Sequence, residues 1–389
     1  MVKTSQVARA EQTICDRQRF DVAIVGSGPA AYAAAVAAAD AGFSVILLRR
    51  RESRHSWGVG EHLSPNAKPL LDELGMAAVA CADVHLESPG VLSCWGEPIA
   101  GCRDYLFNPF GYALNLDRRE FDSMLMSTAS DSGAFVLDIT RIEELRRCNA
   151  HWQIFLSNFP SSRPVFARFL IDATGRAATV ARMLGYRPKK FDKLVALHAL
   201  VEQTINTNAH LLLEAAEDGW WYSVPLTRGR CVAVYMTDAD HVPRETDACK
   251  AFWMSRLDSS PATRIRVRPT SSITEVRIAP ACSQALTTVA GPDWLAIGDS
   301  AMAFDPLAAV GLEKALAGAI DARDTLLSLL RKGNWQPKTH NNASRKRVND
   351  YLENRHRYYC LERRWPHSSF WQRRQIKDAQ HHYDGTLCR

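Results

Sequence analysis

The chain has 389 residues, of which 46% are hydrophobic and 23% are charged, and its net charge is +6. This composition is typical of a globular protein, and the length allows two domains or one large interleaved domain. The small net charge does not favour a nucleic-acid partner. The ten cysteines form no CxxC pair, so the sequence supports neither a zinc site nor any other metal site.

The N-terminal residues 1–19 contain no apolar run like that of a signal peptide, and we interpret them as a disordered lead-in. No apolar run reaches the length of a membrane span, including the alanine-rich stretch Ala30–Ala41. The sequence therefore predicts a cytoplasmic protein without a membrane contact. Basic residues gather in the last quarter of the chain, where aromatic residues separate them, and we interpret them as the solvated face of a packed helix.

The first predicted elements form a βαβ unit. An apolar strand, Phe20–Val25, leads through a glycine turn into an alanine-rich helix that ends at Gly42, and a second strand covers Ser44–Leu48. In such a turn the glycines let the backbone approach a pyrophosphate at the N-terminus of the helix. The predicted dinucleotide ligands are the residues of this turn: Gly26, Gly28, Pro29, Ala30 and Ala31.

The second strand is followed by Arg49, at the position where such folds usually place an acid that holds the adenosine ribose. Arg49 is therefore a candidate cofactor ligand that would favour a 2′-phosphate. Alternatively, Glu52 or backbone groups hold the ribose.

Further along the chain, strands and helices follow in a mixed order. Helical spacing predicts helices at Leu116–Met126, Asp247–Leu257 and Leu312–Leu330, and a basic, aromatic helical tail over residues 342–377. Predicted strands are Ala134–Leu137, His151–Ser157, Val165–Asp172, Leu194–Val201, Trp220–Val224, Cys231–Met236, Ser271–Arg277 and Trp294–Ile297.

This order predicts an α/β fold, in which a Rossmann-like dinucleotide-binding domain is interleaved with a β-sheet-rich substrate domain and followed by a C-terminal helical tail. The predicted dinucleotide-binding domain is discontinuous and covers residues 20–80, 101–188 and 286–335. The predicted substrate domain covers residues 81–100 and 189–285, and the tail covers residues 336–389.

Motifs spread over the chain support a specific resemblance. They are Gly60-Glu61-His62, Leu116-Asp117-Arg118, Asp172-Ala173-Thr174-Gly175, Gly298-Asp299 and Asp305-Pro306-Leu307. In this order they resemble the flavoprotein monooxygenases of the p-hydroxybenzoate hydroxylase fold, over most of residues 20–330. The resemblance implies that the Rossmann-like domain binds FAD. The cofactor ligands that it implies are Glu61, Arg118, Asp299, Pro306, Val310, Gly311 and Leu312. A second GxGxxG turn is absent from the sequence, so NAD(P)H would bind transiently, or a separate reductase would supply reduced flavin.

The segment GWWYSVPL, Gly219–Leu226, is similar to the GWxWxIP segment of the flavin-dependent tryptophan halogenases and related hydroxylases. The similarity implies that Trp220, Trp221 and Tyr222 contact the substrate. Halogenases also carry a lysine between the GE motif and a tryptophan, and the corresponding stretch Asp83–Trp95 has none. Where halogenases hold the halide with a Ser/Thr-Gly pair, this chain has Ala308-Ala309. Both departures disfavour halogenation.

The tail segments Tyr358–Pro366 and Phe370–Arg374 resemble the C-termini of flavoproteins that mature peptidyl tryptophylquinone cofactors. The resemblance implies an FAD monooxygenase that uses O₂ to hydroxylate tryptophan through a flavin C4a-hydroperoxide, with a partner polypeptide as substrate. Glu61, His62 and Asp305 are the candidate catalytic groups beside the reacting ring. Two alternatives stay open: a small-molecule hydroxylase or halogenase of secondary metabolism, and a non-catalytic flavin-bearing assembly factor.

Overall fold

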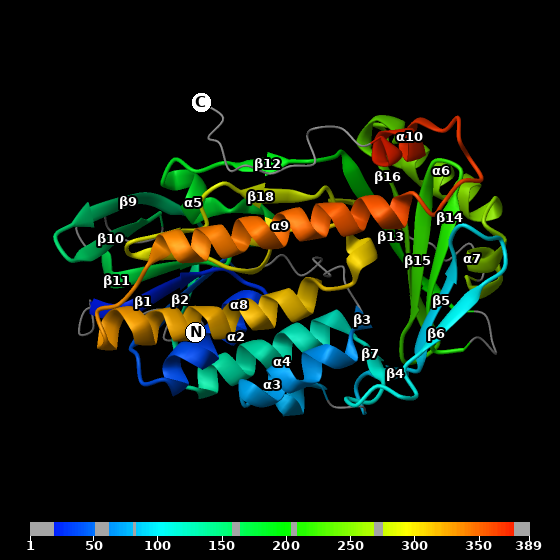
Figure 1. Cartoon of the computed structure of the whole chain (residues 1–389). Helices are drawn as coiled ribbons and strands as arrows, with labels where there is room; N and C mark the ends of the chain where they lie inside the picture. Colours follow the sequence, from blue (N-terminus) through cyan, green and yellow to red (C-terminus); the bar gives the residue numbers. More distant parts are fainter. Residues whose placement is uncertain are drawn as a thin grey trace.

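The computed structural model describes residues 19–50, 62–80, 83–157, 164–203, 208–267 and 275–376, and two large sheets dominate it (Figure 1). The predicted lead-in, except Arg19, and the candidate Glu61 lie outside the described residues. Within the part of the chain that is described, no helix is both long enough and apolar enough to cross a membrane.

An eight-stranded sheet carries the predicted βαβ unit. Its central strands β11, β1, β2 and β8 are parallel, and their residues form nearly continuous apolar runs because helices or loops cover both faces. Strand bounds along the sheet are β19 Ala290–Gly291, β20 Trp294–Ala296, β11 Val165–Asp172, β1 Arg19–Val25, β2 Val45–Arg50 and β8 Phe135–Ile139, with β10 His151–Leu156 and β9 Ile142–Cys148 beside β11. The strands predicted in this sheet are confirmed to within two residues at most ends.

Three helices lie together on this sheet: α2 (Pro29–Asp40), α4 (Arg118–Asp131) and α8 (Gly311–Leu326) (Figure 1). The alanines of α2 are nearly all buried, and their small side chains let α8 approach closely. Helix α4 begins two residues later than predicted because Asp117 caps it, accepting a hydrogen bond of 3.1 Å from the Arg119 N–H.

The second sheet has seven strands in the order β17-β13-β16-β15-β14-β5-β6. Their bounds are β17 Arg277–Pro280, β13 Leu194–Glu202, β16 Arg230–Asp238, β15 Gly219–Pro225, β14 Leu211–Ala216, β5 Gly90–Cys94 and β6 Gly101–Asp104. Strands β5 and β6 form a hairpin, so the domain boundary predicted at residue 100 falls inside this sheet. Helices α6 (Thr246–Asp258) and α7 (Pro261–Arg266) pack on one face.

Short strands connect the two sheets. Strands β3 (His62–Leu63), β7 (Ala113–Asn115) and β4 (Leu86–Ser88) form one small sheet, which contributes to the candidate site described below. A second one contains β12 (Pro188–Lys190), β18 (Gln284–Leu286) and β21 (Met302–Ala303).

The tail forms helices α9 (Pro337–Tyr359) and α10 (Ser369–Gln375), and α9 runs from the first sheet to the second (Figure 1). The interpretation of its basic residues as a solvated face is wrong for two of them. Arg355 is buried against Asp192 at 2.5 Å, and Arg374 is buried against Asp238 at 2.6 Å. A guanidinium group can be buried only beside a partner of opposite charge. Asp192 and Asp238 lie where the tail packs, and they provide this partner for Arg355 and Arg374.

Candidate cofactor and substrate site

The glycine turn between β1 and α2 combines a tight packing contact with an open space. A Cβ atom on Gly26 would collide with the backbone carbonyl of Ala173, so only glycine fits there. A Cβ atom on Gly28, the N-cap of α2, would meet no atom of the described residues within 4 Å. Pro29 follows as the first residue of the helix. The backbone N–H groups at this helix end are therefore accessible to a phosphate group.

A second turn, Gly298–Ser300, lies close to this helix end. Gly298 has a φ of +58°, and a Cβ atom there would lie 3.0 Å from the Cβ atom of Ala30. The next residue, Asp299, forms ion pairs with Lys314 at 2.7 Å and with Arg176 at 3.8 Å. Two chain segments that are separated by about 270 residues in the sequence thus meet at one edge of the sheet.

The charge state of Asp299 is set by its neighbours. Burial opposes ionisation, but Lys314 and Arg176 outweigh it and hold the pKa of this carboxyl below its usual range. Burial in turn lowers the pKa of Lys314. Lys314 lies one helical turn after Gly311, and this spacing is the signal by which sequence reasoning could have found it. An ionised carboxylate at this position can accept hydrogen bonds from hydroxyl groups of a ligand.

Hydrogen bonds of Asp305 fix the turn before α8. Asp305 caps the short helix Pro306–Ala308, because its Oδ1 atom accepts a 3.0 Å hydrogen bond from the Leu307 N–H. Its Oδ2 atom accepts a 2.7 Å hydrogen bond from the Tyr359 hydroxyl. Burial raises the pKa of Asp305. Both oxygens of this candidate catalytic group are therefore engaged within the protein.

The residues after this turn form the N-terminus of α8, which borders an open space. Ala309 adopts a left-handed φ of +50°, Val310 is the N-cap, and Leu312 is buried. Among the residues that the structure describes, none has an atom within 4 Å of a Cβ atom placed on Gly311. The α8 N-terminus therefore presents backbone N–H groups to an open space, as the implied flavin contacts require.

Helix α9 supplies a face that sequence reasoning missed. Tyr351, Arg355 and Tyr359 are spaced by four residues and lie on one side of the helix. The Tyr351 hydroxyl accepts a 2.7 Å hydrogen bond from the Asp305 N–H and lies 2.7 Å from the Ser283 hydroxyl. The i, i+4 spacing of these large polar residues in the tail was the available signal.

His62 lies on β3, and its ring is fixed by Asn115. The side-chain N–H₂ of Asn115 donates a 2.8 Å hydrogen bond to the Ala209 carbonyl, so its Oδ1 atom faces the His62 Nδ1 atom at 3.0 Å. Because this oxygen only accepts, His62 must donate from Nδ1. Burial lowers the pKa of His62, which favours the neutral ring. The lone pair then lies on Nε2, which is buried and has no hydrogen-bond partner among the described residues.

The three aromatic residues predicted to contact the substrate lie on both faces of β15. Trp220 and Tyr222 face the tail, and the Trp220 ring nitrogen donates a 3.0 Å hydrogen bond to the Tyr359 hydroxyl. Trp221 points to the opposite face, where it packs against Trp253 of α6. All three are buried. The structure therefore brings Trp220 and Tyr222 together near the turn at Asp305, and it separates Trp221 from them.

The two candidate arginines are both in ion pairs. Arg49 contacts Asp138 of the neighbouring strand β8 at 2.7 Å, so its charge is balanced within the sheet. Arg118, the first residue of α4, contacts Asp122 at 3.1 Å. Arg118 also lowers the pKa of Asp299, which indicates that the two side chains share one region.

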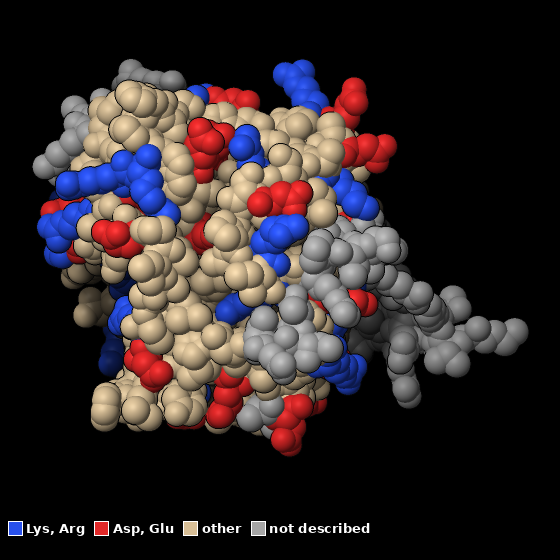
Figure 2. All heavy atoms as spheres, turned by 90° about the vertical axis from the view of Figure 1, so that its right-hand side faces the viewer, with Lys and Arg blue, Asp and Glu red and all other residues tan. Residues whose placement is uncertain are grey.

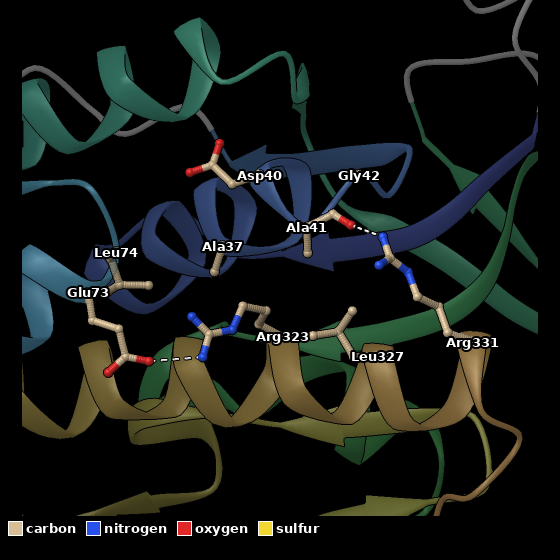
Figure 3. A pocket seen from close by; sticks show the side chains of 9 residues that line it. All are labelled: Ala37, Asp40, Ala41, Gly42, Glu73, Leu74, Arg323, Leu327 and Arg331. Carbon is tan, nitrogen blue, oxygen red and sulfur yellow. Dashed lines mark hydrogen bonds and ion pairs between the residues drawn. The ribbon is translucent and has the colours of Figure 1, made fainter.

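A hollow of about 590 Å³ lies at the other end of α2, between that helix, α3 (Lys68–Glu73) and α8 (Figure 3). Arg323 points to Glu73 and pairs with it at 2.9 Å, and Arg331 donates to the Ala41 carbonyl. Both guanidinium groups are thus engaged, and this hollow is separate from the glycine turn at the start of α2.

Comparison with known proteins gives both sequence and structural relatives. The putative FAD-dependent oxidoreductase LodB of Marinomonas mediterranea is 27% identical over 371 residues, which cover 94% of this chain and 99% of that protein. A tryptophan 2-halogenase of Chondromyces crocatus is also 27% identical, but the match spans only 61% of its length.

Two solved structures share the fold. The peptidyl tryptophan dihydroxylase QhpG has a TM-score of 0.74 at 22% identity, and the match covers 92% of this chain and 79% of QhpG. The myxobacterial chondrochloren halogenase CndH has a TM-score of 0.80 at 21% identity, with 93% and 87% covered. At such identities the likeness shows the fold alone.

The residues present fit an FAD molecule. Space is open beside Gly28, where a pyrophosphate would meet α2, and beside Gly311, where backbone N–H groups would meet the flavin. Asp299 lies between these two helix ends with an ionised carboxylate. The family model of the FAD binding domain matches residues 19–354. The chain therefore belongs to the FAD binding domain family and is an FAD-dependent oxidoreductase.

Proposed function

We propose that the protein is an FAD monooxygenase that hydroxylates the indole ring of a tryptophan side chain in a partner polypeptide, as a step of quinone cofactor biogenesis. Bound FAD would supply the redox chemistry, with NAD(P)H or a reductase as the source of two electrons and O₂ as the oxidant. One oxygen atom enters a C–H bond of the ring, and the other leaves as water. The likeness to QhpG, whose described substrate is a peptidyl tryptophan, supports this choice of substrate.

The observation that carries the proposal is the Nε2 acceptor of His62, for which the described residues provide no hydrogen-bond donor. A buried nitrogen lone pair without a donor is unfavourable, and an indole N–H group supplies the missing donor. Ser64, two residues after His62, donates a 3.3 Å hydrogen bond to Glu313 in the first turn of α8. His62 therefore belongs to the region in which the start of α8 faces the expected flavin.

The other residues of the site serve binding and exclusion of water. Backbone N–H groups at Val310–Leu312 would stabilise negative charge on the reduced ring, and Asp299 would accept hydrogen bonds from the ribityl chain. Trp220 and Tyr222 would form an apolar wall on the substrate side. In this proposal none of these groups transfers a proton.

Halogenation is the weaker alternative. The stretch Asp83–Trp95, where halogenases carry their lysine, contains none. Lys68, the only lysine between residues 51 and 187, is the first residue of α3. The Ala308-Ala309 pair offers no hydroxyl group to a halide. These features support oxygen transfer over halide oxidation.

The test uses the polypeptide encoded beside the gene of this protein, isolated from cells with and without the protein. The expected result is a mass gain of one or more oxygen atoms on a single tryptophan, only when the protein is present and loaded with FAD. A bromine atom in a bromide-containing reaction would favour the halogenase. Maturation by protein that has been stripped of FAD would favour the assembly factor.

The role of His62 is tested with Asn115→Asp. A carboxylate next to Nδ1 would raise the pKa of His62, so that the ring is protonated near neutral pH and loses its acceptor. The expected result is a pH profile of kcat/KM that shifts to higher pH at unchanged FAD content. If kcat/KM decreased by the same factor at every pH, His62 and Asn115 would have only a structural role.

A further inference from the structure

Strands β14, β5 and β6 place three ligand-type side chains on one face of the second sheet. Gly90 of β5 pairs with Asp104 of β6, and Leu211 of β14 pairs with Val91 of β5. Continuing that parallel register by one residue places His210 beside Gly90, in the same row as Asp104. Gly90 has no side chain, so nothing on the central strand separates the two outer residues.

The third side chain is Cys102, which lies two residues before Asp104 on β6 and therefore points to the same face. One ligand atom from each of Cys102, Asp104 and His210 lies within 4.8 Å of the other two. Closer approach around a single ion requires only side-chain rotation, because Cys102 and Asp104 are exposed.

We propose that Cys102, Asp104 and His210 bind a zinc ion. A thiolate, an imidazole and a carboxylate together favour zinc over magnesium or calcium, which prefer oxygen ligands alone. Three protein ligands leave one position of the tetrahedron for water. The sequence analysis assigned no metal because the ten cysteines form no CxxC pair. Cys102 and Asp104 are separated from His210 by more than a hundred residues, and only the pairing of the strands brings the three together.

The surroundings of His210 support binding. Its Nδ1 atom is buried and has no hydrogen-bond partner among the described residues. The Arg266 guanidinium donates a 2.6 Å hydrogen bond to the His210 carbonyl and a 3.0 Å hydrogen bond to the Asn208 side chain, so the segment is held in place.

Asp104 is also oriented. Its Oδ1 atom accepts a 2.6 Å hydrogen bond from the Leu106 N–H, which leaves Oδ2 for an ion. In Figure 2 the side of the molecule that carries β5 and β6 in Figure 1 faces the viewer, and positive and negative side chains are mixed over it. Because this side carries charges of both signs, its overall field would not select a cation. The selectivity for zinc would come from the thiolate and the imidazole.

A bound ion would join the β5–β6 hairpin to the segment before β14. That segment also contains Ala209, whose carbonyl holds Asn115 and through it His62. The proposed ion would thus stabilise the substrate side of the molecule without contacting the flavin.

The experiment uses the FAD-loaded full chain without an affinity tag. It is incubated with Zn²⁺ and, separately, with Co²⁺, and then passed through a desalting column. We expect one zinc per chain by elemental analysis, and with cobalt a thiolate-to-metal charge-transfer band in the near ultraviolet. Cys102→Ser and His210→Gln should lower zinc retention at least tenfold and abolish the cobalt band, because each removes one of three ligands.

Cys148→Ser, at an exposed cysteine of β9, is the matched control and should retain the metal like the parent protein. FAD absorbance should be unchanged in all variants, so the outcome is independent of the proposed function. Absence of stoichiometric zinc in the parent protein, or equal zinc content in Cys102→Ser and in the control, would overturn the proposal.

Discussion

The hydroxyl group of Tyr359 donates a 2.7 Å hydrogen bond to the carboxylate of Asp305. The same hydroxyl accepts a 3.0 Å hydrogen bond from the ring nitrogen of Trp220. One tyrosine of the tail thus joins the turn before α8 to β15, the central strand of the second sheet. All three side chains are buried, so water cannot replace either hydrogen bond.

Tyr359→Phe keeps the volume of the side chain and removes both hydrogen bonds. The Oδ2 atom of Asp305 then lacks its donor, and the ring nitrogen of Trp220 lacks its acceptor. We expect the free energy of unfolding to fall by about 2–4 kcal/mol, since each buried group left unsatisfied costs about 1–3 kcal/mol. The measurement is urea denaturation of the purified variant. Tyr358→Phe is the matched control because Tyr358 is exposed on the same helix, and we expect a change below about 0.5 kcal/mol. Equal losses in the two variants would contradict the buried network.

The glycine turn gives a prediction that separates folding from cofactor binding. Gly26→Ala would press a Cβ atom against the Ala173 backbone, so we expect a large loss of stability even without FAD. Gly28→Ala would place its methyl group in open space. We therefore expect that variant to fold like the parent protein and to bind FAD at least tenfold more weakly, because the methyl group occupies the expected pyrophosphate position. Melting temperature without FAD and FAD titration measure the two effects, and unchanged FAD affinity in Gly28→Ala would contradict this site.

Local patterns were sufficient to predict the βαβ unit, because β1, its glycine turn and α2 obey local rules of strand, turn and helix formation. The ordered motifs likewise indicated the family through their resemblance to known flavoproteins, and the structure places Asp299 in the short helix Gly298–Ser300 and Gly311 at the start of α8. These motifs consist of residues that are adjacent in the sequence, so they can be found without knowledge of the fold.

Spacing along α8 and α9 marks Lys314 and Tyr359 as candidates, but the partners of these residues depend on distant pairing and could not be predicted. Tyr359 reaches Asp305 only because α9 crosses from one sheet to the other, and Lys314 meets Asp299 only once α8 has packed. Strand β14, with the sequence LLLEAA, lacks the alternation that marks a strand with one exposed face, since both of its faces are largely buried. The side on which Trp221 lies follows from strand alternation, which the motif comparison did not consider.

His198 on β13 should make the protein sensitive to acid. Burial, with a smaller contribution from Arg277, lowers the pKa of His198 to about 4, from an unfolded value of 6.5, while Glu275 acts in the opposite direction. The unfolded state therefore binds more protons below pH 6.5, and stability is lost as the pH falls from 6.5 towards 4. At pH 5 this group alone should cost about 2 kcal/mol relative to pH 7.

His198→Gln tests this expectation because glutamine does not titrate. We expect the difference between the unfolding free energies at pH 7 and pH 5 to shrink by about 2 kcal/mol in the variant. Other histidines contribute equally in both proteins, so the comparison isolates His198. His151→Gln, at a half-buried histidine of β10, reports what the substitution itself does. An unchanged difference in His198→Gln would show that His198 is already protonated in the folded protein at pH 5.

Ala309 occupies a left-handed conformation, with a φ of +50°, at the end of the turn before α8. This conformation costs a residue with a Cβ atom about 1–2 kcal/mol, whereas glycine adopts it freely. Glycine also gains about 0.4–1 kcal/mol of entropy in the unfolded chain, which offsets part of the benefit. We expect Ala309→Gly to stabilise the protein by about 0.5–1 kcal/mol in urea denaturation. Ala308→Gly is the control: Ala308 has no positive φ, so only the entropic penalty applies and the variant should be less stable than the parent protein. Two losses of similar size would show that position 309 is not strained.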